Sequence, residues 1–213
     1  MSVTRDRTHL RDRDRNARRA TRRAELMEAA VRAIRRDGPL VSMDAIAAEA
    51  GVTKPIVYRH FGDRVGLASA LAEQFGAALV AELDEALRQD LPPEQLLRAT
   101  IDTYLAFVER DPQLYSFLVG RLGASVGNEV TNGLVAQVGR RVALVLGEQL
   151  RGLGIDSGPA ESWAFGIVGM VHLAGDWWLE RRTMTRARLV DDLTALLWNG
   201  LGHLVPAATE EQR

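Results

Sequence analysis

Apolar residues return every three or four positions along most of the chain, which is the period of an amphipathic helix. No stretch shows the strict alternation of a half-buried strand. Glycines, prolines and Asp-Pro steps separate the periodic segments, as helix ends require. The pattern predicts an all-α fold of about nine helices. The first helix covers about residues 21–36, and two short helices follow within 41–61. The later helices cover about 63–89, 92–111, a short stretch from 112, 129–151, 159–182 and 185–204. Residues 120–128 are predicted to form a loop.

The segment 41–71 predicts two short helices joined by a tight turn and followed by a third helix. Gly51 supplies the positive φ that a sharp helix exit needs, and Thr53 suits the N-cap of the second helix. The inward positions of the two short helices are Met43, Ile46, Ala47, Ala50, Val57 and Phe61. This arrangement is typical of a helix-turn-helix, so we expect a three-helix DNA-binding domain here.

The outer face of the second short helix mixes hydroxyls, cations and one aromatic ring, instead of the Glu/Lys pairs of a merely solvated surface. Such a face suits contacts with bases and phosphates in a DNA groove. Lys54 is the only lysine of the chain, which otherwise uses arginine. The predicted DNA-binding residues are Ser42, Thr53, Lys54, Pro55, Tyr58, Arg59, His60 and Arg64.

Several short motifs in this segment resemble the DNA-binding domain of the TetR family of transcriptional regulators. They are the Gly51-Val52 turn, the Thr53-Lys54-Pro55 helix opening, the run from Tyr58 to Phe61 and the Asp63-Arg64 pair. Arginine at 64 replaces the usual lysine and keeps its positive charge. The resemblance implies a homodimeric repressor that places two recognition helices in successive major grooves of a palindromic operator, about 34 to 36 Å apart. A helical hairpin in another all-helical protein is the alternative.

Charge divides the chain into a basic and an acidic part. Residues 1–64 carry 15 Lys and Arg against 9 Asp and Glu, whereas residues 65–213 carry 12 against 19. We therefore predict a disordered basic arm at 1–20, the helix-turn-helix domain at 21–68, a ligand-binding and dimerisation domain at 69–205 and a tail at 206–213. The arm is a candidate for the minor groove of DNA, with a merely solubilising tail as the alternative.

Enzyme and membrane classes are disfavoured by the sequence. No nucleophile elbow, P-loop or dinucleotide-binding motif follows a strand, and the absence of cysteine excludes disulfides and thiolate catalysis. There is no signal peptide and no apolar segment of membrane-spanning length, so a cytoplasmic protein is expected. An all-helical enzyme or an adaptor protein remains the alternative class, but neither explains the outer face of the second helix.

His172 and Asp176 stand four residues apart on a predicted helix. That spacing could place two ligands on one metal ion, but two ligands do not make a site. A hydrogen bond to each other or to a partner helix, or a place in a pocket lining, is the better interpretation. No cofactor or metal is expected.

The last two helices have the character of a dimer interface. Gly166, Gly169 and Gly175 lower helix stability, and close approach of another helix would explain their presence. Four tryptophans lie in the same two helices, which are apolar nearly all round. The TetR resemblance also places the dimer here, as a four-helix bundle of these helices and their symmetry mates. A buried core helix of a monomer is the alternative.

Aromatic and soft side chains on the fifth to eighth helices suit an apolar effector. The predicted ligand-binding residues are Tyr104, Phe107, Tyr115, Phe117, Phe165, Met170 and Trp177, although any of them could simply form the core. Three segments loosely resemble actinobacterial TetR-type regulators of lipid metabolism, namely Phe165–Met170, Trp177-Trp178-Leu179 and Trp198-Asn199-Gly200-Leu201. This resemblance implies a long-chain acyl-CoA or fatty acid as effector. The alternative effector is a hydrophobic drug or lipophilic cation, with Asp176 or Glu180 as counter-charge.

Overall fold

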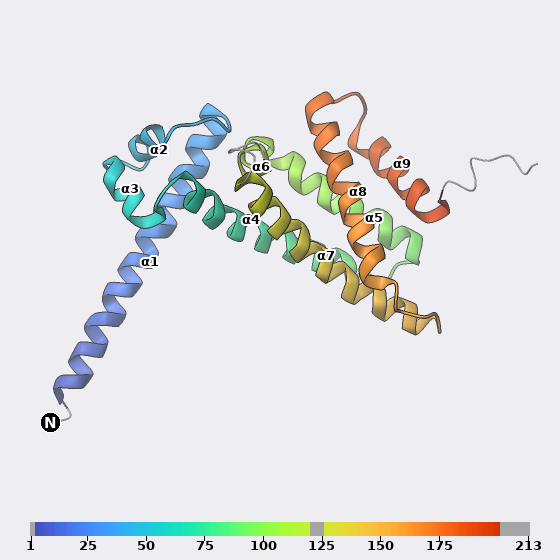
Figure 1. Ribbon diagram of the computed structural model, residues 1–213, viewed down its shortest axis with the longest axis horizontal. Helices are drawn as coiled ribbons and strands as arrows, with labels where there is room; N and C mark the ends of the chain where they lie inside the picture. The colour runs from blue at the N-terminus through green and yellow to red at the C-terminus, as the bar shows by residue number, and fades with distance from the viewer. Residues whose placement is uncertain (1–2, 120–125, 201–213) are drawn as a thin grey trace, which may run out of the picture. The chain divides into compact units, whose positions relative to one another are not determined.

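The computed structural model describes residues 3–119 and 126–200, and this part of the chain is helical without a strand (Figure 1). The predicted all-α fold is therefore confirmed. The helices are α1 (Val3–Asp37), α2 (Met43–Glu49), α3 (Lys54–Phe61), α4 (Arg64–Leu87), α5 (Pro93–Arg110), α6 (Pro112–Val119), α7 (Val126–Gly152), α8 (Ala160–Arg181) and α9 (Arg186–Asn199). None of the described helices has the length and apolarity that crossing a bilayer requires.

The start of α1 corrects the prediction of a disordered arm. The helix begins at Val3 instead of near Thr21, so residues 3–20 are helical. No glycine or proline interrupts residues 3–37, and arginine, the commonest residue of the first half, is a strong helix former. The charge-rich composition suggested disorder, but helix propensity and the continuous connection to the packed half of α1 determine the structure.

Two other helix ends differ from their predicted positions. α7 already begins at Val126, so residues 126–128 of the predicted loop are helical, while 120–125 lie outside the described residues. α9 ends at Asn199, because Gly200 turns the chain with a φ of 63° and its N–H closes the last turn on the Leu196 carbonyl. The predicted continuation to 204 and the tail at 206–213 lie beyond the described residues.

The first compact unit contains α1, α2, α3, the beginning of α4 as far as Glu73, and Gln113–Val130 with α6. Its core is built from apolar side chains at helical spacing: Leu26, Ile34, Ile46, Val57, Leu67, Phe117 and Leu118 are all almost fully buried. The membership of α6 differs from the predicted boundary, which assigned the whole of 69–205 to one C-terminal domain. Segments far apart in sequence thus form this unit.

The second unit contains α4 from Gln74, α5, the rest of α7, α8 and α9. A cluster of buried side chains from α5, α8 and α9 forms its centre: Ile101, Leu105, Val171, Trp178, Leu189, Val190 and Leu193. Gly175 lets α8 approach α5, since a Cβ there would lie 3.1 Å from Leu105 Cδ2. The Trp178 indole donates a hydrogen bond of 2.8 Å to the Met184 carbonyl, which fixes the turn between α8 and α9.

Candidate functional site

The turn between α2 and α3 has the predicted geometry. Ser42 caps α2, its Oγ accepting from the Ala45 N–H at 3.1 Å, and Gly51 adopts a φ of 63°. The Val52 N–H then donates to the Ala47 carbonyl at 3.0 Å, which closes the corner. Thr53 occupies the N-cap of α3 with extended backbone, although its side chain makes no capping hydrogen bond.

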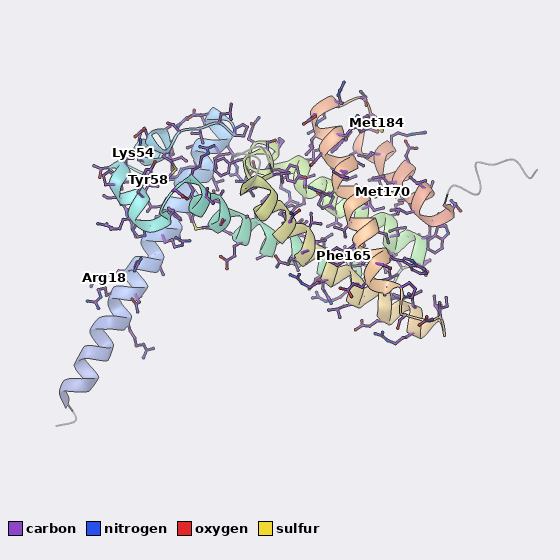
Figure 2. The ribbon with its side chains drawn as sticks, in the orientation of Figure 1. Arg18, Lys54, Tyr58, Phe165, Met170 and Met184 are labelled. Carbon is purple, nitrogen blue, oxygen red and sulfur yellow. The ribbon has the colours of Figure 1, made fainter. Side chains whose placement is uncertain are left out.

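Burial separates the two faces of α3 as the sequence predicts. Val57 and Phe61 are buried in the unit, whereas the predicted DNA-binding residues on the other face reach solvent. Those that are exposed are Ser42, Thr53, Lys54, Pro55, Tyr58 and Arg59, and those that are half-buried are His60 and Arg64. Figure 2 shows Lys54 and Tyr58 on the outer side of α3. Six of the eight predicted residues are thus accessible to solvent.

Lys54 has one partner on α2 and one on its own helix, α3. Its ammonium forms a 2.8 Å ion pair with Asp44 on α2 and stands 5.9 Å from the centroid of the Tyr58 ring. The hydrogen bond to Asp44 raises the pKa of Lys54. Because both members of the pair are well exposed, water screens the pair and it contributes little to stability. The ammonium is therefore held in place on this surface but can exchange its carboxylate partner for an acceptor on a ligand.

His60 lies where α3 meets α1. Arg23 of α1 donates a 2.7 Å hydrogen bond to the His60 carbonyl, and its guanidinium stacks 4.5 Å from the centroid of the Phe61 ring. Partial burial lowers the pKa of the His60 imidazole, and the nearby guanidinium groups of Arg59, Arg19, Arg23 and Arg22 lower it further. The imidazole is accordingly neutral at neutral pH.

Arg64, at the start of α4, contacts the protein itself. Its guanidinium donates to the carbonyls of Val41 and Pro39, the latter at 2.7 Å, and stacks 4.7 Å from the Phe117 ring of α6. Burial lowers its pKa. These contacts tie together α4, the loop before α2 and α6. The predicted phosphate contact of Arg64 stays a prediction, and the structure adds a structural role that the sequence did not indicate.

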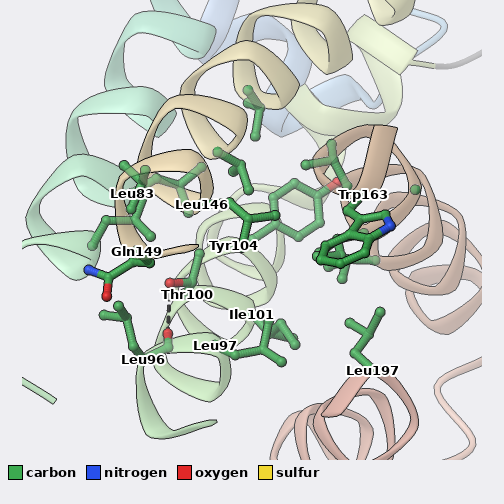
Figure 3. A pocket seen from close by; sticks show the side chains of 18 of the residues that line it. Leu83, Leu96, Leu97, Thr100, Ile101, Tyr104, Leu146, Gln149, Trp163 and Leu197 are labelled. Carbon is green, nitrogen blue, oxygen red and sulfur yellow. Dashed lines mark hydrogen bonds between the residues drawn. The ribbon is translucent and has the colours of Figure 1, made fainter. Parts of the chain in front are cut away.

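The second unit contains a cavity of about 640 Å³ between the end of α4, α5, α7, α8 and α9 (Figure 3). The lining is aliphatic and aromatic with a few neutral polar groups, and no described lining residue carries a charge. It comprises Leu83, Leu87, Pro93, Leu96, Leu97, Thr100, Ile101, Tyr104, Val138, Val142, Val145, Leu146, Gln149, Ser162, Trp163, Gly166, Ile167, Val168, Val171, Leu197 and Trp198. Such a lining accommodates an apolar molecule.

Of the seven predicted ligand-binding residues, only Tyr104 lines this cavity. Phe107 packs edge-on against Phe75, with the ring centroids 4.6 Å apart, and Phe165 covers Gly139 of α7. Tyr115 and Phe117 are buried in the first unit, and Met170 and Trp177 are exposed on α8. The other six predicted residues thus belong to the core or the surface, while most of the lining is aliphatic.

The sequence reasoning missed the contribution of α7 to the cavity. Val138, Val142 and Val145 recur at spacings of four and three residues, which places them on one helical face. That periodicity indicates an inward face but does not distinguish a packed face from a cavity wall.

Tyr104 connects the cavity with the polar pair on α8. Its hydroxyl lies 3.0 Å from Nδ1 of His172, whose Nε2 lies 3.8 Å from the Asp176 carboxylate. Of the alternatives that the sequence left open for His172, the hydrogen bond to another helix is the one observed. Within the described residues, no group of three or more His, Cys, Asp and Glu side chains is placed to hold a metal ion.

One face of α8 carries large apolar side chains that the subunit does not cover. Trp163, Met170 and Trp177, spaced by seven residues, are 50%, 39% and 44% exposed, and Leu173 is 67% exposed. A seven-residue repeat is the pattern of a helix seam. A Cβ added at Gly166 or Gly169 would meet nothing within 4 Å, in contrast to Gly175 against α5.

Two family models match the sequence. One describes bacterial regulatory proteins of the tetR family and matches residues 26–71, and the other describes a tetracyclin repressor-like C-terminal domain and matches residues 82–212. The chain belongs to the TetR family of transcriptional regulators. TetR-family proteins are transcriptional regulators with a DNA-binding and a ligand-binding domain, and they are not enzymes. The predictions of a TetR-type regulator and of a protein that is not an enzyme are therefore confirmed.

Individual relatives agree with this TetR assignment. An uncharacterized HTH-type transcriptional regulator of Mycobacterium tuberculosis is 35% identical over 187 residues, which is 87% of this chain and 80% of the relative. The HTH-type transcriptional activator FasR of Mycolicibacterium smegmatis is 27% identical, covering 76% and 74% of the two chains.

Solved structures share the fold. A tetR-family regulator from Streptomyces coelicolor has a TM-score of 0.66 at 27% identity, covering 84% of this chain and 79% of that one. FadR from Bacillus subtilis, solved with stearoyl-CoA, has a TM-score of 0.65 at 18% identity and covers 82% and 96% of the two chains. At that identity the likeness to FadR shows the fold alone.

Proposed function

We propose that this protein is an effector-responsive repressor that binds a palindromic operator as a homodimer, and that its effector is a hydrophobic molecule such as a long-chain acyl-CoA or a fatty acid. The observation that carries the effector class is the uncharged, mainly aliphatic cavity of about 640 Å³. Its volume lies within the range of small-molecule sites, about 300 to 1,000 Å³. An acyl chain satisfies such a lining without leaving a buried charge unpaired.

A lipophilic cation is the second candidate effector, and the lining supports it less. A buried cation needs a carboxylate or a face of aromatic rings around it. Neither Asp176 nor Glu180, the counter-charges expected from the sequence, is among the residues that line the cavity. The fold of Bacillus subtilis FadR, which was solved with stearoyl-CoA, supports the acyl class by showing that this architecture can hold an acyl chain.

On the DNA side, α3 enters the major groove and the exposed residues of its outer face make the contacts. Lys54 exchanges Asp44 for a base edge, whereas Tyr58 and Arg59 reach phosphates and fix the register. His60 is neutral and offers a hydrogen bond without charge. Two copies of α3 read half-sites about 34 to 36 Å apart.

The homodimer forms through α8 and α9. The exposed stripe of Trp163, Met170, Leu173 and Trp177 is covered by the same stripe of a second copy, as a twofold interface requires. Gly169 leaves open space beside this stripe in the subunit, which allows a partner helix to come close.

The test begins with selection of operator fragments from random duplex DNA by the purified protein. Operator affinity is then measured with palmitoyl-CoA, palmitic acid or tetraphenylphosphonium as probe. We expect the lipids to change the affinity about 5- to 150-fold, the usual span of allosteric coupling, and the cation to leave it unchanged. A fall in affinity indicates a repressor that the effector releases, and a gain indicates a co-repressor or the activator mode named for FasR. A response to the cation alone would contradict the acyl class.

A further inference from the structure

Residues 15–22 of α1 are helical, and no side chain among them is buried. Every side chain from Arg15 to Arg22 is exposed, and Figure 1 shows this part of the helix extending past α2 and α3. A helix that is polar on every side gains no stability from burial. An unburied helix with this composition therefore calls for an explanation outside the subunit's own core.

Arginines on this part of α1 follow helical spacing. Arg15, Arg18, Arg19 and Arg22 stand at positions i, i+3, i+4 and i+7, so they share one face. Arg18 is seen projecting from the helix in Figure 2. Arg22, at the inner end of the row, pairs with Glu25 at 2.6 Å.

This basic face is continuous with the end of α3. Arg23 is bonded to the His60 carbonyl and stacked on Phe61, so α1 and α3 are joined where the arginine row ends. Burial has the largest effect on the pKa of His60 and lowers it. The guanidinium groups of Arg59 on α3 and of Arg19 and Arg22 on α1 are close enough to lower this pKa further. The row on α1 thus extends the positive surface that begins on the recognition helix.

We propose that the N-terminal half of α1 binds, as a helix, the phosphates of duplex DNA that flank the half-site read by α3. The proposal rests on DNA binding by the helix-turn-helix. A helix with its side chains is about 10 to 12 Å across, whereas the minor groove is about 6 Å wide. The helix therefore lies over the phosphate backbone, in place of the extended arm in the minor groove that the sequence suggested, and its contacts add affinity without base preference.

The experiment measures binding of the full-length dimer to two duplexes, the selected operator alone and the operator extended at each end by one helical turn of DNA. Affinity is recorded against salt concentration. For the parent, we expect tighter binding to the longer duplex and a steeper dependence of log affinity on log salt. Replacing Arg15, Arg18 and Arg19 together by glutamine removes the advantage of the longer duplex. It also lowers the slope by about 0.9 for each phosphate that the variant no longer neutralises.

A proline at residue 17 tests whether DNA binding needs the helical structure of α1 in addition to its charge. Ala17→Pro keeps every arginine but removes the N–H that bonds to residue 13 and clashes with its carbonyl. We expect it to lose the advantage of the longer duplex as the arginine variant does, while Ala17→Ser retains it. The melting temperature of both stays near the parent value, because no described side chain from Arg15 to Arg22 is buried.

Two results would overturn the proposal. An arginine variant with the parent's slope on the longer duplex would show that the row does not contact phosphates. An Ala17→Pro variant that binds like the parent, beside a weakened arginine variant, would show a charged but non-helical arm. The control replaces Arg88, Arg98 and Arg188 of the second unit by glutamine, which changes the net charge equally. Failure of the parent to bind any selected operator would instead refute DNA recognition by α3.

Discussion

At the scale of single residues, weak contacts hold the exposed side chains of α3 in position. Lys54 is paired with Asp44 across the turn, and both are exposed enough for water or DNA to compete. The carboxylate positions the ammonium but also opposes the approach of phosphates. This balance makes Asp44, which the sequence analysis did not single out, a residue that tunes DNA affinity.

Asp44→Asn should therefore increase affinity for both operator and random DNA. The pair is exposed and screened by water, which limits the gain to a few-fold. Fluorescence anisotropy with labelled duplexes measures the effect. Asp90→Asn, an equal charge change at an exposed position of the second unit, serves as control. Weaker binding of Asp44→Asn than of the control would mean that the pair is needed to orient Lys54.

His60 predicts a pH dependence of stability. Its pKa is lower in the folded protein than the ordinary 6.5, so the unfolded chain binds the proton more readily. Stability should then rise with pH through the window below about 6.5 and become independent of this group above it. Melting temperatures of the parent and of His60→Gln, compared between about pH 5 and 8, isolate the contribution. Parallel pH profiles would contradict it.

At the scale of elements, the junction of α4, α6 and the loop before α2 depends on one side chain. Arg64 satisfies two backbone carbonyls and stacks on Phe117. The sequence indicated only its charge, because the partners come from positions 23 to 53 residues away and no local pattern reports them. The cation thus has a defined structural role beside its predicted one.

Arg64→Gln distinguishes the two roles. We expect a decrease of about 1 to 3 kcal/mol in the free energy of unfolding, because two partly buried carbonyls lose their donors. The slope of log operator affinity against log salt should stay as in the parent. Chemical denaturation and a salt series provide the two measurements. A slope smaller by about 0.9 per subunit, at unchanged stability, would show that Arg64 contacts phosphate instead.

A further prediction concerns the dimer interface at the exposed stripe of α8. Gly169→Leu meets open space within the subunit, so it should leave the fold intact, but it should weaken the dimer by crowding the partner helix. Sedimentation at graded concentrations measures the dimer, and operator affinity should fall with it, since a monomer contacts one half-site. Gly175→Leu is the contrasting variant, because it collides with Leu105 and lowers subunit stability. A Gly169→Leu protein as dimeric as the parent would remove α8 from the interface.

Elements also differ in how well the sequence predicted them. The α2–turn–α3 segment was predictable because its apolar spacing, its capping residue and Gly51 are local signals that agree. The start of α1 was not, because charge-rich composition and helix propensity gave opposite indications for residues 3–20. The cavity was not predictable from the sequence. Periodicity indicates which side of α7 faces inward, whereas an unfilled volume depends on how five elements pack.

At the scale of the whole molecule, α4 carries residues of both functions along one helix. It begins at Arg64 beside the helix-turn-helix, and Leu83 and Leu87 near its other end line the cavity. A ligand that shifts the equilibrium between two arrangements of α4 needs a differential affinity of only about 1 to 3 kcal/mol to change operator binding severalfold or more. We infer that this helix couples the cavity to the helix-turn-helix.

The most direct measurement compares operator affinity with and without palmitoyl-CoA for the parent, Val142→Trp and Leu144→Trp. Val142 lines the cavity, so tryptophan there occupies the space of the ligand, whereas Leu144 is 61% exposed on the same helix and does not line it. We predict that palmitoyl-CoA changes operator affinity for the parent and for Leu144→Trp, and that Val142→Trp binds the operator but no longer responds. A full response of Val142→Trp would contradict the account, because the effector would then act from outside this cavity.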